Sequence, residues 1–138
     1  MIVVDASVLA PALADTRPDG ELARTRLLRE RLAAPHLIDV EVASIFRRAV
    51  RGGSLEREPA QQALTKLERM PLQRTPHHPL LDRIWELREN LTAYDAAYIA
   101  LAEAINALFI TADTKIPKAP GLRCPVELIG PAATGAHG

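Results

Sequence analysis

The stretch Thr92-Ala93-Tyr94-Asp95-Ala96-Ala97-Tyr98-Ile99-Ala100-Leu101-Ala102-Glu103-Ala104 is the segment around which the chain is organised. It predicts a helix that begins at Thr92, and its frequent alanines allow neighbouring backbone to approach closely on more than one side. Asp95 lies in the first turn and shares a face with Ile99 and Ala102, so its carboxylate points along an apolar surface. Two interpretations fit: a capping box with Thr92 as N-cap, or a metal-binding carboxylate held at a helix start.

Two short apolar runs are each followed closely by an acidic residue. Residues 2–4 precede Asp5, and residues 107–111 precede Asp113. Each run is typical of a buried parallel strand. Ligands of open α/β sheets bind at the carboxyl ends of the strands, and both acids stand at such ends. Each acid also fits a helix N-cap, but a charge at the tip of a buried strand favours a functional role for Asp5.

Helical periodicity and the positions of proline and glycine predict the remaining elements. We expect helices over residues 21–32, 37–51, 59–70 and 77–90, and further short strands over residues 32–34, 72–75 and 126–129, the last at an edge of the sheet. In the helix over residues 77–90, Trp85 is expected to face the core. Strands that alternate with helices indicate an α/β fold with a doubly wound parallel sheet.

Glu41 lies on the apolar stripe of the helix expected over residues 37–51. A carboxylate there needs a cation or hydrogen-bond donors to offset its desolvation. Arg48 lies seven residues further along the same face and is a candidate for that cation. Asp39 points to another side of the helix and is expected to be solvated.

The composition predicts one globular domain over residues 1–130 and a flexible tail over residues 131–138. Of the 138 residues, 48% are hydrophobic and 25% are charged, and no stretch approaches a membrane span. The net charge of zero argues against a wide basic surface for duplex nucleic acid, but 14 of the 17 basic residues are arginines, which suit a local phosphate-binding groove. The single cysteine, Cys124, and the absence of a visible secretory signal predict a cytoplasmic protein.

The four separate acids point to one metal site. In a parallel sheet Asp5 and Asp113 share a rim, and the helix starts that carry Glu41 and Asp95 lean over it. Carboxylates without a cluster of His or Cys favour hard cations such as Mg²⁺ or Mn²⁺, which also relieve the repulsion between the acids. Metals held in this way lower the pKa of an attacking water and stabilise a leaving oxygen, so they suit phosphodiester hydrolysis.

Four segments, in order, resemble the four acidic motifs of the PIN-domain ribonucleases: Val3-Val4-Asp5-Ala6-Ser7, Leu37-Ile38-Asp39-Val40-Glu41-Val42, Leu91-Thr92-Ala93-Tyr94-Asp95-Ala96-Ala97-Tyr98 and Phe109-Ile110-Thr111-Ala112-Asp113. The length of the chain and its tyrosine-flanked third motif resemble the VapC toxins of bacterial type II toxin–antitoxin systems. One departure is Thr114-Lys115, which follows Asp113 where relatives often carry another acid. That departure weakens the expectation of a second metal ion and does not change the expected fold.

The resemblance implies a three-layer α/β/α sandwich with a four- or five-stranded parallel sheet. It implies that one or two Mg²⁺ ions, or Mn²⁺ in their place, and a water that attacks RNA are held by Asp5, Glu41, Asp95 and Asp113. Ser7 and Thr111 would orient a carboxylate or a water, and Arg48 is a candidate contact to the RNA backbone. The resemblance further implies a homodimer and a cognate VapB antitoxin that inserts a helix or a basic residue into the cleft.

Other protein classes share parts of this pattern of residues. A haloacid-dehalogenase-like phosphotransferase also places a nucleophilic Asp after a strand, but it carries a second Asp two residues further on, where this chain has Ser7. A receiver-type signalling domain needs a pair of acids after the first strand, and none is present. A catalytically inactive α/β binding domain stays a candidate, although the presence of all four acids counts against it. We therefore expect a metal-dependent endoribonuclease toxin.

Overall fold

The computed structural model describes residues 1–130; the predicted tail over residues 131–138 lies outside the described residues. Five strands form one parallel sheet in the order β3-β2-β1-β4-β5. Their bounds are β1 Ile2–Val4, β2 Leu32–Pro35, β3 Gln73–Thr75, β4 Leu108–Thr111 and β5 Val126–Leu128. The strand that begins the chain is therefore the central one, and β5 lies at an edge as predicted.

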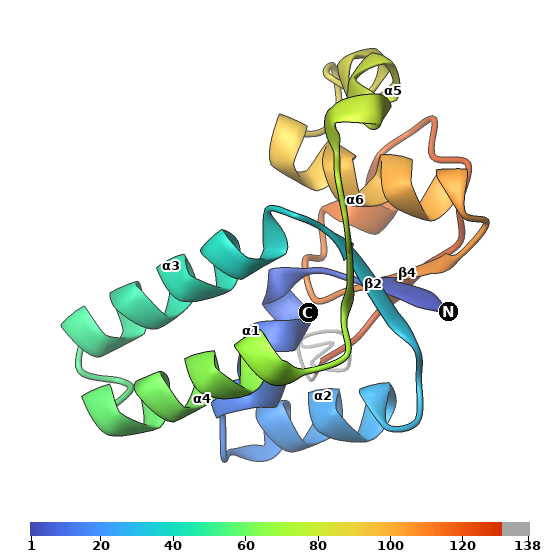
Figure 1. The fold of residues 1–138 in the computed structure, drawn as a ribbon. Coiled ribbons are helices and arrows are strands. Elements are labelled where there is room, and N and C mark those ends of the chain that lie inside the picture. The colour runs from blue at the N-terminus through green and yellow to red at the C-terminus, as the bar shows by residue number, and fades with distance from the viewer. Residues whose placement is uncertain (131–138) are drawn as a thin grey trace.

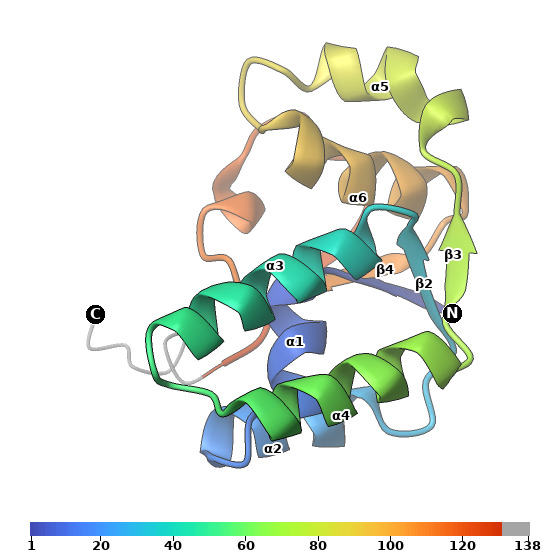
Figure 2. The same cartoon turned by 60° about the vertical axis from the view of Figure 1, so that its left-hand side comes forward.

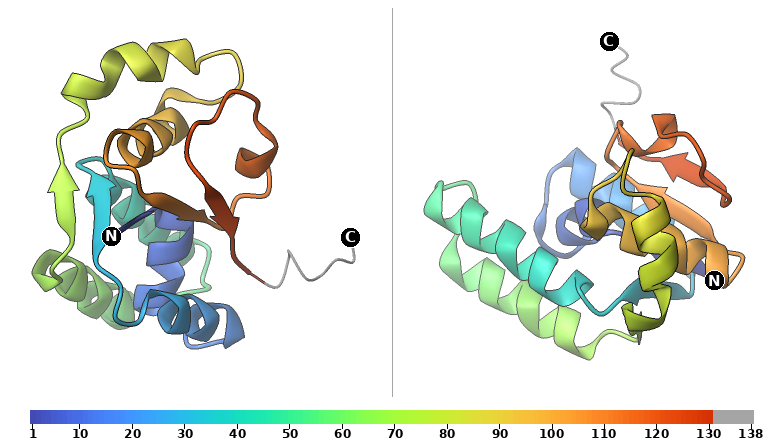
Figure 3. Two further views of the ribbon diagram at one scale, coloured as in Figure 1. Left: turned by 90° about the vertical axis from the view of Figure 1, so that its right-hand side faces the viewer. Right: turned by 90° about the horizontal axis from the view of Figure 1, so that it is seen from above.

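Helices cover both faces of this sheet (Figure 1). The α-helices are α1 Ala6–Ala14, α2 Pro18–Leu27, α3 Ile38–Arg51, α4 Arg57–Arg69, α5 Leu81–Glu86 and α6 Ala93–Ala104, and the 3₁₀ turns are η1 His78–Leu80 and η2 Ile116–Lys118. Helices α5 and α6 lie on one side, and α1, α2 and α4 lie on the other (Figure 3). The three-layer α/β/α fold is thus confirmed. None of the helices within residues 1–130 has the length and apolar character that a membrane crossing requires.

Helix α6 is packed on more than one side, as its alanines predict. It contacts the central strands β1, β2 and β4, and its outer side is covered by α5 (Figure 2). Every residue from Ala96 to Ala102 is buried. Small side chains allow this close approach, and the aromatic ring of Tyr98 stacks on Phe109 of β4 with centroids 5.9 Å apart. The helix that carries Asp95 is therefore fixed against the middle of the sheet.

The segment between β3 and α6 differs from its predicted form. The single helix expected over residues 77–90 is replaced by the short turn η1 and the six-residue α5. The prediction that Trp85 faces the core is wrong: its side chain is 67% exposed, and the Arg88 guanidinium lies 4.5 Å from the centre of its ring. The inward positions of this short element are filled by Ile84 and Leu87 instead.

Asp39 keeps a side chain that is 39% exposed, so it is partly solvated as expected, but it also has a partner that was not predicted. Its carboxylate accepts two hydrogen bonds from the Arg74 guanidinium of β3, at 2.7 and 2.9 Å. Arg74 also donates to the Leu67 carbonyl at the end of α4. Paired hydrogen bonds of this kind add geometric specificity. They join the first turn of α3 to an edge of the sheet, which helps to fix the helix that carries Glu41.

Candidate active site

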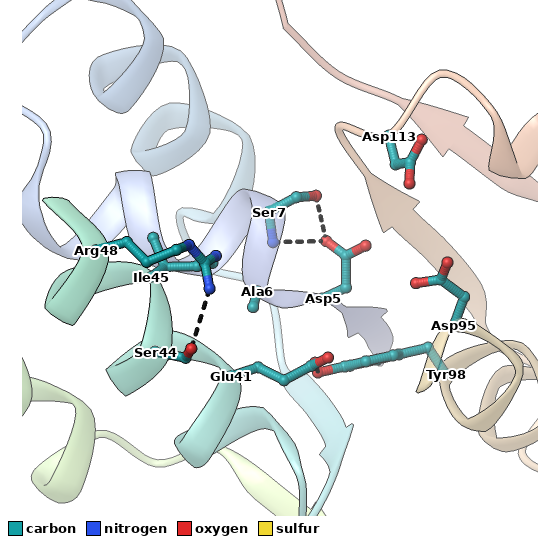
Figure 4. Close-up of a pocket in the computed structure, with 10 residues that line it drawn as sticks. All are labelled: Asp5, Ala6, Ser7, Glu41, Ser44, Ile45, Arg48, Asp95, Tyr98 and Asp113. Atoms are coloured by element: carbon teal, nitrogen blue, oxygen red, sulfur yellow. Dashed lines mark hydrogen bonds between the residues drawn. The ribbon is translucent and has the colours of Figure 1, made fainter. Parts of the chain in front are cut away.

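The four acids predicted from the sequence line one open pocket of about 280 Å³ (Figure 4). Asp5 lies between β1 and α1, and Asp113 follows β4. Glu41 and Asp95 lie in the first turns of α3 and α6. The pocket is also lined by Ala6, Ser7, Ser44, Ile45, Arg48 and Tyr98. All four acids therefore come together, from segments that are far apart in the sequence.

Asp5 is the most firmly held of the four. Only 6% of its surface is exposed, and one carboxylate oxygen accepts from both the backbone N–H and the hydroxyl of Ser7, at 3.1 and 2.5 Å. The other oxygen accepts from the Thr111 hydroxyl at 2.6 Å. Asp5 is thus the N-cap of α1 and a wall of the pocket at once. Burial raises the pKa of Asp5 to about 6, although the hydrogen bonds from Ser7 and Thr111 oppose that rise.

The same two hydroxyls hold the end of β4. The Ser7 hydroxyl accepts from the Ala112 N–H at 2.9 Å, and the Thr111 hydroxyl accepts from the Asp113 N–H at 3.1 Å. Each hydroxyl therefore links Asp5 to the backbone that leads to Asp113. Ser7 and Thr111 lie beside the acids, as the resemblance implies.

Asp95 faces Asp5 and Asp113 across the pocket (Figure 4). The Thr92 hydroxyl accepts a hydrogen bond from the Asp95 N–H at 3.1 Å, so Thr92 is the predicted N-cap. The carboxylate of Asp95 itself points into the pocket. Burial raises the pKa of Asp95, and the negative charge of Asp113 raises it further, while a hydrogen bond from Thr92 and the ammonium group of Lys115 lower it. Asp95 in turn raises the pKa of Asp5.

Glu41 is hydrogen-bonded by Tyr98, for which sequence reasoning predicted no separate role. The Tyr98 hydroxyl donates a hydrogen bond to Glu41 Oε1 at 2.5 Å. Burial raises the pKa of Glu41, the Tyr98 hydrogen bond lowers it, and the charge of Asp95 raises it. The signal for Tyr98 was available, since a buried tyrosine one turn after Asp95 requires a partner for its hydroxyl.

The alternative ion pair between Glu41 and Arg48 does not form. Arg48 is exposed at the edge of the pocket, and its guanidinium donates to the Ser44 hydroxyl at 3.0 Å. Within residues 1–130, no carboxylate forms a salt bridge with Arg48. A positive charge at the edge of an acidic pocket is thus left without an acidic partner in the described chain.

The chemistry of the donor set fits a hard divalent cation. The acids offer only oxygen ligands, and burial raises the pKa of three of them, so a bound cation would favour their charged forms. Within residues 1–130, no three His, Cys, Asp or Glu side chains are grouped tightly enough to enclose an ion by themselves. Mg²⁺ does not require such a cage, because it keeps several waters and takes one or two carboxylates together with substrate phosphates.

Comparison with known proteins identifies the family of the chain. Residues 2–122 match the family model described as PIN domain. A VapC ribonuclease of Mycobacterium bovis is 43% identical over 129 residues, which cover 94% of this chain and 98% of that protein. Among solved structures, a protein of Pyrobaculum aerophilum superposes with a TM-score of 0.66 at 25% identity, covering 91% of this chain and 81% of its own.

A further solved structure supports the fold alone because its identity is low. VapBC2 of Rickettsia felis, bound to a DNA fragment from its promoter, has a TM-score of 0.63 at 17% identity and covers 93% of this chain and 98% of its own. The family match and the high identity to a VapC ribonuclease extend over nearly the whole chain. The chain belongs to the PIN-domain family, within its VapC group.

Proposed function

We propose that this protein is a metal-dependent endoribonuclease toxin that hydrolyses RNA phosphodiester bonds. The observation that carries the proposal is the meeting of Asp5, Glu41, Asp95 and Asp113 in one pocket at the carboxyl end of a parallel sheet. The ribonuclease name of a relative 43% identical supports the same activity. Family membership counts against the haloacid-dehalogenase alternative, and a binding domain without activity remains the alternative to be tested.

The four acids would hold one or two Mg²⁺ ions, or Mn²⁺. The ion, when bound, lowers the pKa of an attacking water and stabilises the charge on the leaving oxygen. The protein's own part is to fix the ligands before substrate arrives. Asp5 is held by Ser7 and Thr111, and Asp95 is held at the start of a helix packed on the sheet. Lys115 brings a positive charge toward Asp95, which favours one ion over two.

The first experiment is cleavage of RNA by the purified protein with Mg²⁺ or Mn²⁺, compared with the same reaction in EDTA. Calorimetry with Mn²⁺ measures metal binding independently of cleavage. Cutting that requires metal, together with saturable binding, is the expected result. If no RNA is cut and no metal binds, the ribonuclease proposal is wrong and the binding-domain alternative holds.

Arg48 is proposed to contact the RNA backbone. Its guanidinium lies at the edge of the pocket without a carboxylate partner in the described chain, and its hydrogen bond to Ser44 limits its motion. A planar guanidinium suits bidentate contact with phosphate. Such a contact would position the chain of the substrate without reading its bases.

Replacing Arg48 by glutamine is expected to raise KM for RNA by about tenfold, the factor that corresponds to about 1.4 kcal/mol of lost binding. The dependence of binding on salt concentration should also weaken, because one phosphate contact is lost. Arg47→Gln is the matched control, since Arg47 is an exposed neighbour on α3 that does not line the pocket. Equal effects of the two variants would mean that only overall charge matters.

Thr111 is proposed to orient Asp5, and its hydroxyl can be removed with little change of shape. Thr111→Val is expected to weaken Mn²⁺ binding or cleavage by about 10- to 100-fold, the usual cost of losing a hydrogen bond to a metal ligand. Thr111→Ser keeps the hydroxyl that donates to Asp5 at 2.6 Å and should retain most of the affinity. Calorimetry of both variants measures this difference. Loss of affinity in Thr111→Ser as well would assign the effect to packing.

A VapB-type antitoxin is the proposed partner, and a homodimer is the proposed assembly. The solved relative from Rickettsia felis is a VapBC complex, which supports an antitoxin for this chain. We further propose that residues 1–130 form the nuclease domain and that the protein acts in the cytoplasm, where RNA is present. Co-expression with the antitoxin, followed by size-exclusion chromatography with light scattering, measures both assemblies.

A further inference from the structure

Tyr98 connects the two helices that carry acids of the pocket. Its side chain lies on α6 with only 1% of its surface exposed, and its hydroxyl donates to Glu41 Oε1 of α3 at 2.5 Å. Helix α3 packs against α1 and α4, whereas α6 packs against the sheet and α5. Within residues 1–130, the Tyr98–Glu41 bond is the only side-chain hydrogen bond that joins α3 to α6.

The ring of Tyr98 leaves its hydroxyl little freedom. The ring stacks on Phe109 of β4, with centroids 5.9 Å apart and planes inclined by 25°. Because the ring is buried and stacked, the hydroxyl is a donor at a fixed point in the pocket wall. Figure 4 shows the Glu41 side chain extended toward the hydroxyl end of this ring, with Asp5 and Asp95 beside the same ring.

The hydrogen bond from Tyr98 uses only one of the two carboxylate oxygens of Glu41. Oε1 accepts from Tyr98, and Glu41 Oε2 accepts no hydrogen bond from residues 1–130. A glutamate side chain has several rotatable bonds, and half-burial alone does not select one arrangement. A charge-assisted hydrogen bond from a fixed donor does select one. The remaining oxygen is then held toward the pocket.

We propose that Tyr98 is a positioning residue that fixes the Glu41 carboxylate for metal and substrate through the hydrogen bond to Oε1. This inference rests on the proposed function, because Glu41 matters only if the pocket binds metal or RNA. Tyr98 does not itself contact the reacting atoms. Small errors in the placement of a catalytic group are costly, so loss of the hydroxyl should reduce activity although the fold is unchanged.

Tyr98→Phe removes the hydroxyl and keeps the ring that stacks on Phe109. We expect about a tenfold loss in kcat and about a tenfold weaker Mn²⁺ affinity by calorimetry, the lower end of the usual effect of removing a hydrogen bond to a metal ligand. KM for RNA should change little. Tyr94→Phe is the matched control, because Tyr94 lies on the same helix but is 66% exposed and does not line the pocket.

A double-mutant cycle with Glu41→Ala separates positioning from a general structural role. If Tyr98 acts through Glu41, Tyr98→Phe will weaken Mn²⁺ binding in the wild-type background and have no further effect in Glu41→Ala. An equal loss in both backgrounds would overturn the inference, as would wild-type affinity and kcat in Tyr98→Phe. A wild-type protein that neither binds Mn²⁺ nor cuts RNA would overturn the proposed function as well. An active wild type beside an unaffected Tyr98→Phe overturns only the inference about Tyr98.

Discussion

Replacing Asp95 by asparagine is expected to reduce metal-dependent RNA cleavage by about 10³-fold or more. An ion held by these acids would stabilise the transition state by several kcal/mol, and about 1.4 kcal/mol corresponds to a factor of ten in rate. Asp95 faces Asp5 and Asp113 across the pocket, so its charge is one of those that would hold the ion (Figure 4). Asparagine has nearly the same shape but lacks that charge.

The fold of Asp95→Asn should be intact, because the N-cap bond of α6 comes from the Asp95 backbone and asparagine can still accept a hydrogen bond from Thr92. The Asp95 backbone N–H bonds the Thr92 hydroxyl, and this bond is kept in the variant. Asp19→Asn is a matched control, since Asp19 is an exposed acid in the first turn of another helix, α2, and lies outside the pocket. Single-turnover cleavage and circular dichroism are measured on both variants. Wild-type rates in Asp95→Asn would remove this residue from the site.

Replacing Asp5 by asparagine is expected to stabilise the metal-free protein at neutral pH by up to about 3 kcal/mol, the free-energy equivalent of its pKa shift. Burial raises the pKa of Asp5 from 3.8 to about 6, so the folded state binds the proton more tightly than the unfolded chain does. The stability gained from that proton is complete below about pH 3.8 and is lost as the pH rises through about 6. Asparagine has no proton to lose.

The advantage of Asp5→Asn should therefore be present at pH 7 and disappear near pH 4. Urea unfolding of the wild type and the variant in EDTA, at several pH values, measures it. Asparagine preserves an acceptor for Ser7 and can donate to the Thr111 oxygen, so the local network survives. Added Mg²⁺ should reverse the order, because ligands that bind only the folded wild type stabilise it. A difference that does not depend on pH would exclude titration of Asp5 as its cause.

The results expected for these two variants are those of a site whose buried carboxylates lower the stability of the metal-free fold. Three of the acids have raised pKa values because burial and mutual repulsion disfavour their charged forms. Residues that weaken stability are commonly kept where activity requires them. Higher stability without metal, combined with loss of cleavage, is the expected signature of such a site.

Much of the fold could be predicted because the strands and longer helices carry local signals. Three predicted elements correspond to observed ones. The apolar run before Asp5 forms β1, the alanine-rich segment after Thr92 forms α6, and the run before Asp113 forms β4. The spacing of apolar residues in these segments follows which side of each element is buried, so it can be recognised in the local sequence. The prediction for the segment around Trp85 was wrong because its apolar residues lie on more than one side, so their pattern does not define the side that faces the core. Packing buries Ile84 and Leu87 instead.

The sequence by itself determined which residues stand at strand ends and helix starts, and hence which acids form the pocket. Strand polarity and helix capping are local properties, so the positions of Asp5, Asp95 and Asp113 at strand ends and a helix start follow from the sequence alone. Only the tertiary structure decided the partners of two acids, which are Arg74 for Asp39 and Tyr98 for Glu41. Both bonds join segments more than 30 residues apart, and their geometry follows from how the helices and the sheet pack, which no local pattern encodes.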